Sequence, residues 1–106
     1  MKKIRFNKKI IIKKNIIQNE LEKAVWEDVI TCFANVENLL EMNLKNVEGL
    51  DYGHVISEEL YLFTIRYSNL LQCGMRIIFE DQIYEIKRIN DVAFKKRYNQ
   101  IIAQKI

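Results

Sequence analysis

The chain has 106 residues and a mass of 12.7 kDa, with 49% hydrophobic and 29% charged residues and a formal net charge of +3. These values predict one globular domain over residues 1–106 that buries roughly two-thirds of the surface its unfolded chain exposes. They exclude a disordered chain, and no window approaches the ~20 apolar residues that span a bilayer. Because Ile10–Ile12 is too short for a signal-peptide core, we expect the protein to stay in the compartment where it is made.

The first predicted strand, near residues 4–14, is strongly basic. Residues 1–14 carry seven Lys and Arg side chains and no acidic one, whereas residues 15–106 carry 10 basic and 14 acidic groups. Apolar and polar side chains alternate through most of this stretch, which is typical of a strand. A basic N-terminal segment on an otherwise acidic domain favours contact with nucleic acid, but a solvated strand face is the more common reason for such a run of charges.

Residues 25–40 are the ambiguous part of the chain. Asn19 and Glu22 have the spacing of a helix capping box, and the apolar residues that follow recur at helical intervals. A period-two alternation that runs from Trp26 to Val36 fits a strand as well, although an acidic residue interrupts it. Periodicity alone favours the helix.

Residues 58–91 are the most strand-like part of the chain. Aromatic and β-branched residues alternate in Leu60–Tyr67, and further apolar runs follow at Met75–Phe79 and Ile83–Ile89. The polar turn between the last two runs is a hairpin signal. A last strand near residues 99–106 completes the chain.

The sequence contains no pattern typical of catalysis or metal binding. Its glycines are not spaced as a phosphate-binding loop, and neither serine lies in a nucleophile elbow. Cys32 or Cys73 could pair with His54 as a catalytic thiol and imidazole, but almost any small protein with a cysteine and one histidine offers such a pair. One histidine and no closely spaced cysteine pair provide too few ligands for a structural zinc site. Because the chain lacks an export signal, we expect both cysteines to be unpaired, buried thiols. The residues indicate a non-enzymatic domain without metal or cofactor.

Aromatic residues of the central strands leave two interpretations open. Tyr61, Phe63 and Tyr67, with Arg66 beside them, have the composition of a surface that stacks single-stranded bases on a small barrel. Such a stripe is more often core or interface. The alternative function is therefore a small β-barrel that binds nucleic acid through its basic N-terminal strand.

Several short stretches occur in a recognisable order along the chain. They are Arg5–Ile12, Trp26–Leu39, Ser57–Glu58, Thr64–Tyr67, Met75–Arg76, Phe79, Ile83–Ile86 and Asn90–Asp91. No single stretch is specific, but the ordered set covers nearly the whole chain. It resembles the head–tail joining proteins, also called head closure or adaptor proteins, of long-tailed bacteriophages and prophages.

The resemblance implies a mainly β fold, and it implies a long strand where periodicity favours a helix. The expected fold is a small, partly closed, six-stranded antiparallel barrel with a long loop or short helix inserted at about 39–55. Its strands are expected near residues 4–14, 25–38, 56–67, 75–80, 83–90 and 99–106. Its expected core residues are Trp26, Phe33, Ile65, Tyr67, Tyr84 and Ile86. The family usually has a glycine where Asp81 stands, so we expect the hairpin turn to relax away from type I′.

The resemblance also implies a function. Such proteins are non-enzymatic virion components at the head–tail interface, made in the cytoplasm of the bacterial host. They form a ring below the portal that closes the DNA-filled head and offers a surface to the tail. The expected partners are the portal or portal-adaptor ring, the tail terminator or tail-tube protein and further copies of the chain, which is monomeric in isolation. DNA passes through the channel without sequence-specific binding, and no membrane contact is expected.

Residues 39–55 are the expected docking element of that ring. Their apolar side chains are interleaved with charged ones, and a closed barrel has little room for them, so they should be exposed to a partner. The candidate interface residues are Leu40, Met42, Leu44, Val47, Leu50 and Tyr52.

Overall fold

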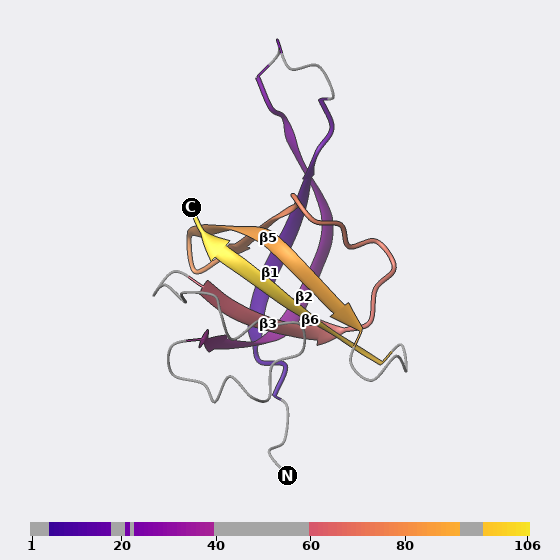
Figure 1. Cartoon of the computed structure of the whole chain (residues 1–106), viewed down its shortest axis with the longest axis vertical. Helices are drawn as coiled ribbons and strands as arrows, with labels where there is room; N and C mark the ends of the chain where they lie inside the picture. Colours follow the sequence, from indigo (N-terminus) through magenta and orange to yellow (C-terminus); the bar gives the residue numbers. More distant parts are fainter. Residues whose placement is uncertain (1–4, 18–20, 22, 40–59, 92–96) are drawn as a thin grey trace, which may run out of the picture.

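A closed barrel of six antiparallel strands makes up the protein (Figure 1). The computed structural model describes residues 5–17, 21, 23–39, 60–91 and 97–106. In chain order the strands are β1 (Lys8–Asn15), β2 (Trp26–Asn38), β3 (Leu60–Arg66), β4 (Arg76–Phe79), β5 (Gln82–Asp91) and β6 (Tyr98–Lys105). Around the barrel they follow the order β1-β2-β3-β6-β5-β4, and β4 closes it by pairing with β1. The predicted mainly β barrel is confirmed, and the described ranges contain no α-helix.

Strand β2 forms although its periodicity alone favours a helix. It pairs with β1 from Lys8↔Ala34 to Asn15↔Trp26, and its last residues also pair with β3. Helical spacing reports only local preference, whereas the hydrogen bonds of a strand come from distant parts of the chain and override that preference. The strand that the family resemblance implied is therefore confirmed, and the helix favoured by periodicity is wrong.

The core lies inside the barrel, where alternate residues of each strand meet. Phe63 is fully buried at its centre and contacts Tyr84 edge-to-face at 5.3 Å between ring centroids. Such aromatic pairs add about 0.5–1.5 kcal/mol beyond the area they bury. Burial raises the pKa of the Tyr84 hydroxyl, and the neighbouring Tyr61 and Glu80 raise it further. The buried core residues are Ile10, Ile12, Ala34, Phe63, Ile65, Met75, Ile77, Phe79, Tyr84, Ile86, Ile101 and Ala103.

Three of the residues expected in the core lie inside it and three do not. Ile65, Tyr84 and Ile86 are buried. Phe33 is 58% exposed, because it lies opposite Lys9 on the outer face of the barrel. The half-buried Trp26 begins β2, and the half-buried Tyr67 follows the end of β3. The prediction is wrong for Phe33 because successive residues of a strand point to opposite faces, and for Trp26 and Tyr67 because both lie at strand ends rather than inside the barrel.

The predicted insertion begins with a residue that is anchored on the barrel. Leu39 is fully buried and forms a small second cluster with Leu62 and Ile102, which lie opposite each other on the outer face of β3 and β6. Residues 40–55 lie outside the described residues.

The turn between β4 and β5 adopts the conformation that we expected it to avoid. Glu80 and Asp81 have φ values of 49° and 62°, and they join the directly paired residues Phe79 and Gln82. Positive φ at both central residues is the hallmark of a type I′ turn, whose twist matches that of the flanking strands. Since β4 also pairs with β1, the barrel holds both ends of the turn in place. The expectation of a relaxed turn is wrong, because closure of the barrel overrides the local cost of about 1–2 kcal/mol per left-handed residue.

This strain predicts that Asp81→Gly stabilises the protein by about 1 kcal/mol, since glycine adopts positive φ without steric cost. Urea denaturation of the purified protein measures the change. Gln82→Gly, at the next exposed position, is the matched control and should destabilise. A lower free energy of unfolding for Asp81→Gly than for the unaltered protein would show that the turn carries no such strain.

Candidate functional site

The barrel wall is incomplete between β2 and β3. The two strands pair only where Asn35–Asn38 meets Tyr61–Thr64. The preceding part of β2, from Trp26 to Ala34, pairs with β1 on one side, and no described strand pairs with its other side. An unpaired strand edge leaves N–H and C=O groups open to another chain. The barrel therefore has a seam along β2.

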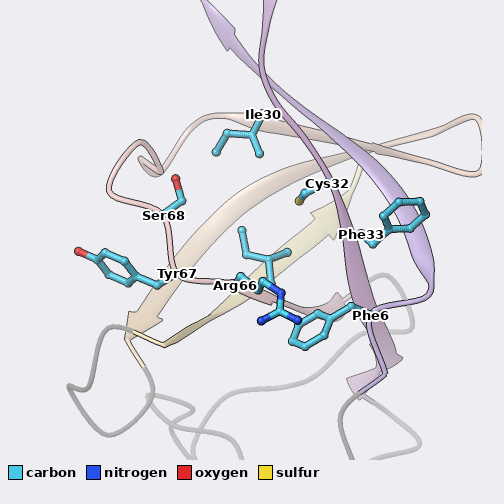
Figure 2. Close-up of a pocket in the computed structure, with 8 residues that line it drawn as sticks. Phe6, Ile30, Cys32, Phe33, Arg66, Tyr67 and Ser68 are labelled. Carbon is cyan, nitrogen blue, oxygen red and sulfur yellow. The ribbon is translucent and has the colours of Figure 1, made fainter.

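A pocket of about 530 Å³ opens at this seam (Figure 2). Ile30 and Cys32 reach it from β2 and also pack against the barrel core, to which Ile65 belongs. The pocket is mostly apolar, and Arg66 is the cation among its lining residues. We call it the seam pocket; its lining residues are Phe6, Ile30, Cys32, Phe33, Ile65, Arg66, Tyr67 and Ser68.

Aromatic and cationic groups form the rim of the seam pocket. Phe6 stacks on Tyr98 at 5.7 Å between centroids, and the Arg66 guanidinium lies 5.1 Å from the centre of the Phe6 ring. Arg66 and Tyr98 are opposite each other in the β3–β6 ladder, which brings these groups together. Within the part of the chain that the structure describes, no carboxylate forms an ion pair with Arg66. The rim thus presents a guanidinium whose charge is available to a partner.

Asn99 holds the chain that forms the far wall of the seam pocket. Its side chain is 3% exposed, and its Oδ1 accepts a hydrogen bond of 2.8 Å from the backbone N–H of Ser68. Its Nδ2 donates to the backbone carbonyl of Asn90 on β5 at 3.4 Å. The N–H of Tyr67 donates to the carbonyl of Arg97 at 2.9 Å. These bonds fix the exit from β3 against the start of β6.

The hairpin of β1 and β2 extends beyond the barrel at the top of Figure 1. β1 pairs with β4 only over Ile11–Lys13, whereas its ladder with β2 runs on to Asn15, and the N–H of Ile16 then donates to the carbonyl of Val25 at 3.0 Å. Asn15 Oδ1 also accepts hydrogen bonds from Ile17 N–H at 3.0 Å and Val25 N–H at 3.3 Å. One side chain thereby holds both strands together where the ladder ends. We call the hairpin beyond Lys13 the arm.

The end of the arm is apolar and exposed. The exposed fractions are 44% for Ile16, 93% for Leu21 and 48% for Val25. We call these three residues the arm tip. Single exposed apolar side chains are common, but a group of them on a projecting element marks a site of interaction.

The base of the arm is held by charged and aromatic contacts. The Arg76 guanidinium lies 4.3 Å from the centre of the Trp26 ring, and Lys13 forms an ion pair of 3.3 Å with Asp28. Exposed ion pairs contribute about 0–1 kcal/mol each, so these contacts orient the arm more than they stabilise the fold.

Comparison with known proteins assigns this architecture to a family. The profile of the family described as phage head completion protein matches residues 1–106. The chain belongs to the phage head completion protein family. It is a phage structural protein with a role in head closure and a component of the virion head, so the resemblance found in the order of its motifs is confirmed.

The chain is similar to the solution structure of protein SF1141 from Shigella flexneri 2a. The two chains are 18% identical, the similarity covers 99% of this chain and 96% of that chain, and the TM-score is 0.69. At this identity the likeness concerns the fold alone. No curated protein matches the sequence.

The predicted interface residues of the head completion protein, Leu40 to Tyr52, lie outside the described residues, as does His54. The structure instead brings together groups that the sequence analysis did not single out. Phe6 and Tyr98 meet at the seam pocket, and Ile16 and Val25 meet at the arm tip. The apolar pair at residues 16–17, inside a polar stretch, was the local signal for the arm tip. No local signal connects Phe6 with Tyr98.

Two of the three aromatic residues proposed for stacking bases, Tyr61 and Phe63, pack in the barrel interior, whereas the half-buried Tyr67 lines the seam pocket. Phe63 is fully buried, and Tyr61 packs edge-to-face on Tyr84 at 5.2 Å. Neither ring is available to a base. The described residues contain no group of His, Cys, Asp and Glu that could hold a metal ion. No helix among them is long and apolar enough to cross a membrane.

The two cysteines of the chain are free thiols in different environments. Cys32 is half-buried in the seam pocket, and burial raises the pKa of its thiol. Cys73 is exposed, and its thiol donates to the carbonyl of Lys87 at 3.5 Å. The expectation that both are buried is wrong for Cys73, which lies in the loop after β3 rather than in a strand.

These environments predict different thiol reactivities, because the thiolate is the reacting species and burial disfavours it. With a disulfide reagent at neutral pH, Cys73 should react at least tenfold faster than Cys32. Single-cysteine variants, Cys32→Ser and Cys73→Ser, allow each rate to be measured by absorbance. Because burial raises the pKa of the Cys32 thiol, its rate should still increase with pH above the ordinary range of a thiol pKa. Equal rates would show that the seam pocket does not shield Cys32.

Proposed function

We propose that this head completion protein forms a ring below the portal, closes the DNA-filled head there and offers the surface to which the tail attaches. Membership of the family supports the head-closure part of this role. The observation that carries the finer part is the exposure of apolar groups at two separate places, the arm tip and the seam pocket. A subunit that repeats one contact around a rotation axis needs two such surfaces.

The proposed role is non-enzymatic and depends on partners. The ring contacts the portal or portal-adaptor ring on one side and the tail terminator or tail-tube protein on the other. The subunits are made in the host cytoplasm and remain monomeric until they meet the portal, because each contact is weak and the contacts add up only around the ring. DNA passes through the channel without sequence-specific contact.

We also propose that residues 40–52 dock to a neighbouring ring component. The support is their composition, since apolar and charged residues alternate in a segment that follows a residue buried on the barrel, Leu39. The described barrel has its own core, made of strand residues on either side of the segment. Docking through the segment would therefore leave the barrel unchanged.

A chain in which a short Gly/Ser linker replaces residues 40–50 should still fold, since closure entropy depends only weakly on loop length. Circular dichroism and a cooperative melting curve test the fold. In the phage, the same variant should give DNA-containing or leaking heads that do not join tails, visible by electron microscopy.

Supply of the unaltered chain from a plasmid is the control and should restore joining. If the variant chain unfolds, residues 40–50 belong to the core. Normal yields of infectious particles would show that the segment has no docking role.

The alternative function, binding of nucleic acid, rests on the exposed lysines of β1, among them Lys8, Lys9 and Lys14. Phe63 is buried and Tyr61 packs against the core, so the row of rings proposed for stacking bases is not presented together on the surface. We therefore expect no saturable binding of labelled single-stranded DNA by fluorescence anisotropy at about 0.15 M salt. Tight binding with a steep loss of affinity at higher salt would favour the alternative.

A further inference from the structure

One edge of β2 has no partner strand along the seam. Beyond Asn35–Asn38, which pair with β3, this edge runs from Trp26 to Ala34 beside no described strand. None of the backbone hydrogen bonds that the described residues form outside their ladders uses the backbone of residues 26–34. Along such an edge the N–H and C=O groups of alternate residues point outward, where water or another extended backbone satisfies them. We call this stretch the free edge of β2, and its geometry accepts an added strand.

The inner side of the seam is apolar. Ile30 and Cys32 point from β2 into the space between this strand and the chain at Ser68, and both pack against the barrel core (Figure 2). Ile65, which is buried, lines the same space from β3. The volume of about 530 Å³ lies within the ~300–1,000 Å³ range of pockets that enclose drug-sized ligands. The seam pocket therefore has room for apolar side chains on the inner face of an added strand.

The outer side of the seam is basic. The Arg66 guanidinium lies 5.1 Å from the centre of the Phe6 ring, and exposed Lys9 is opposite Phe33 in the β1–β2 ladder. Four exposed cations come from the segments that form this rim: Arg5, Lys9, Arg66 and Arg97. No acidic residue lines the seam pocket, and no described carboxylate forms an ion pair with any of the four cations. The charge on the outer face is therefore open to an acidic partner.

The acidic residues of β2 lie towards the arm and are matched there by lysines. Asp28 forms its ion pair of 3.3 Å with Lys13, and exposed Glu27 is opposite exposed Lys14 in the ladder. The seam is therefore balanced in charge at the arm and basic at its other end. The arm of a second copy, which exposes Lys14 and Lys23, carries the same sign of charge as that basic end and does not fit it.

We propose that the seam binds an extended acidic segment of a partner protein, which adds to the free edge of β2 as a strand. Because successive side chains of a strand point to opposite faces, every second residue of the segment covers Ile30 and Cys32, and the others face Lys9 and Arg66 outside. The partner sequence that fits is an alternation of apolar residues with aspartate or glutamate. Backbone hydrogen bonds give such a contact its affinity, and the pocket and the cations give it specificity. The site belongs to the single subunit, so its test is independent of the proposed ring.

The probe is a synthetic peptide of about seven residues, the length of a short strand, in which glutamate and valine alternate. It is titrated into the isotope-labelled full chain at neutral pH, and the backbone amide signals are followed by NMR. We expect saturable shifts that are largest for residues 29–34 and 65–68. The same peptide with lysine in place of glutamate should bind at least about fivefold more weakly, because it meets the rim cations with like charge. Of two glutamate peptides, one N-methylated at every valine and one at every glutamate, at least one should lose binding, because N-methylation removes the donors that a ladder needs.

Arg66→Glu should reverse the preference, so that the lysine peptide binds and the glutamate peptide does not. Arg88→Glu is the matched control, since Arg88 is an exposed arginine on β5 and the change in charge is the same. It should bind both peptides as the unaltered chain does, and the amide spectrum of each variant also reports its fold. Absence of shifts, shifts away from the seam, or equal binding of the two peptides by the unaltered chain would overturn the proposal. Binding of both N-methylated peptides would show that no strand is added and would overturn it as well.

Discussion

The pairing of β1 with β2 is the constraint on which the rest of the structure depends. The ladder from Lys8↔Ala34 to Asn15↔Trp26 is longer than any other contact that β1 makes. Within the barrel it forms part of the wall, and beyond Lys13, where β4 ends its pairing, it becomes the arm. Because most of β2 is committed to β1, its other edge meets β3 only over Asn35–Asn38, and the seam pocket opens beyond that point. Wall, arm and pocket are thus consequences of one pairing.

A closed barrel with a filled interior suits a protein that functions by assembling with other proteins. The barrel interior is filled by side chains such as Phe63 and Tyr84, so the subunit is a rigid body and not a container for a ligand. Closure removes most strand edges, which protects a free subunit from pairing at random with other chains. Among the described residues, the large exposed apolar side chains lie on the arm, at the seam and at single positions on the surface. Weak contacts through such surfaces become strong only when many are made at once.

Closure of the barrel also explains the strained turn between β4 and β5 and the position of the chain after β3. Glu80 and Asp81 adopt left-handed conformations because β4 is paired on both sides. Asn99 joins the chain after β3 to β5 through its side-chain hydrogen bonds. The turn holds the adjoining ends of β4 and β5, and Asn99 holds the chain that leaves β3. The pocket and the arm are therefore presented in fixed positions relative to each other.

The sequence alone predicts the strands of residues 60–91, because the alternation and the polar turn are local signals that do not depend on the rest of the barrel. It did not determine β2, whose spacing fits a helix as well as a strand, nor the face on which Phe33 lies, because register depends on the partner strand. The candidate site, in contrast, depends on the arrangement of the strands in space. Phe6 and Tyr98 come from opposite ends of the chain and meet through the β3–β6 ladder, and the seam pocket exists because two strands diverge. Contacts between segments that are remote in sequence cannot be predicted from the local pattern of either segment.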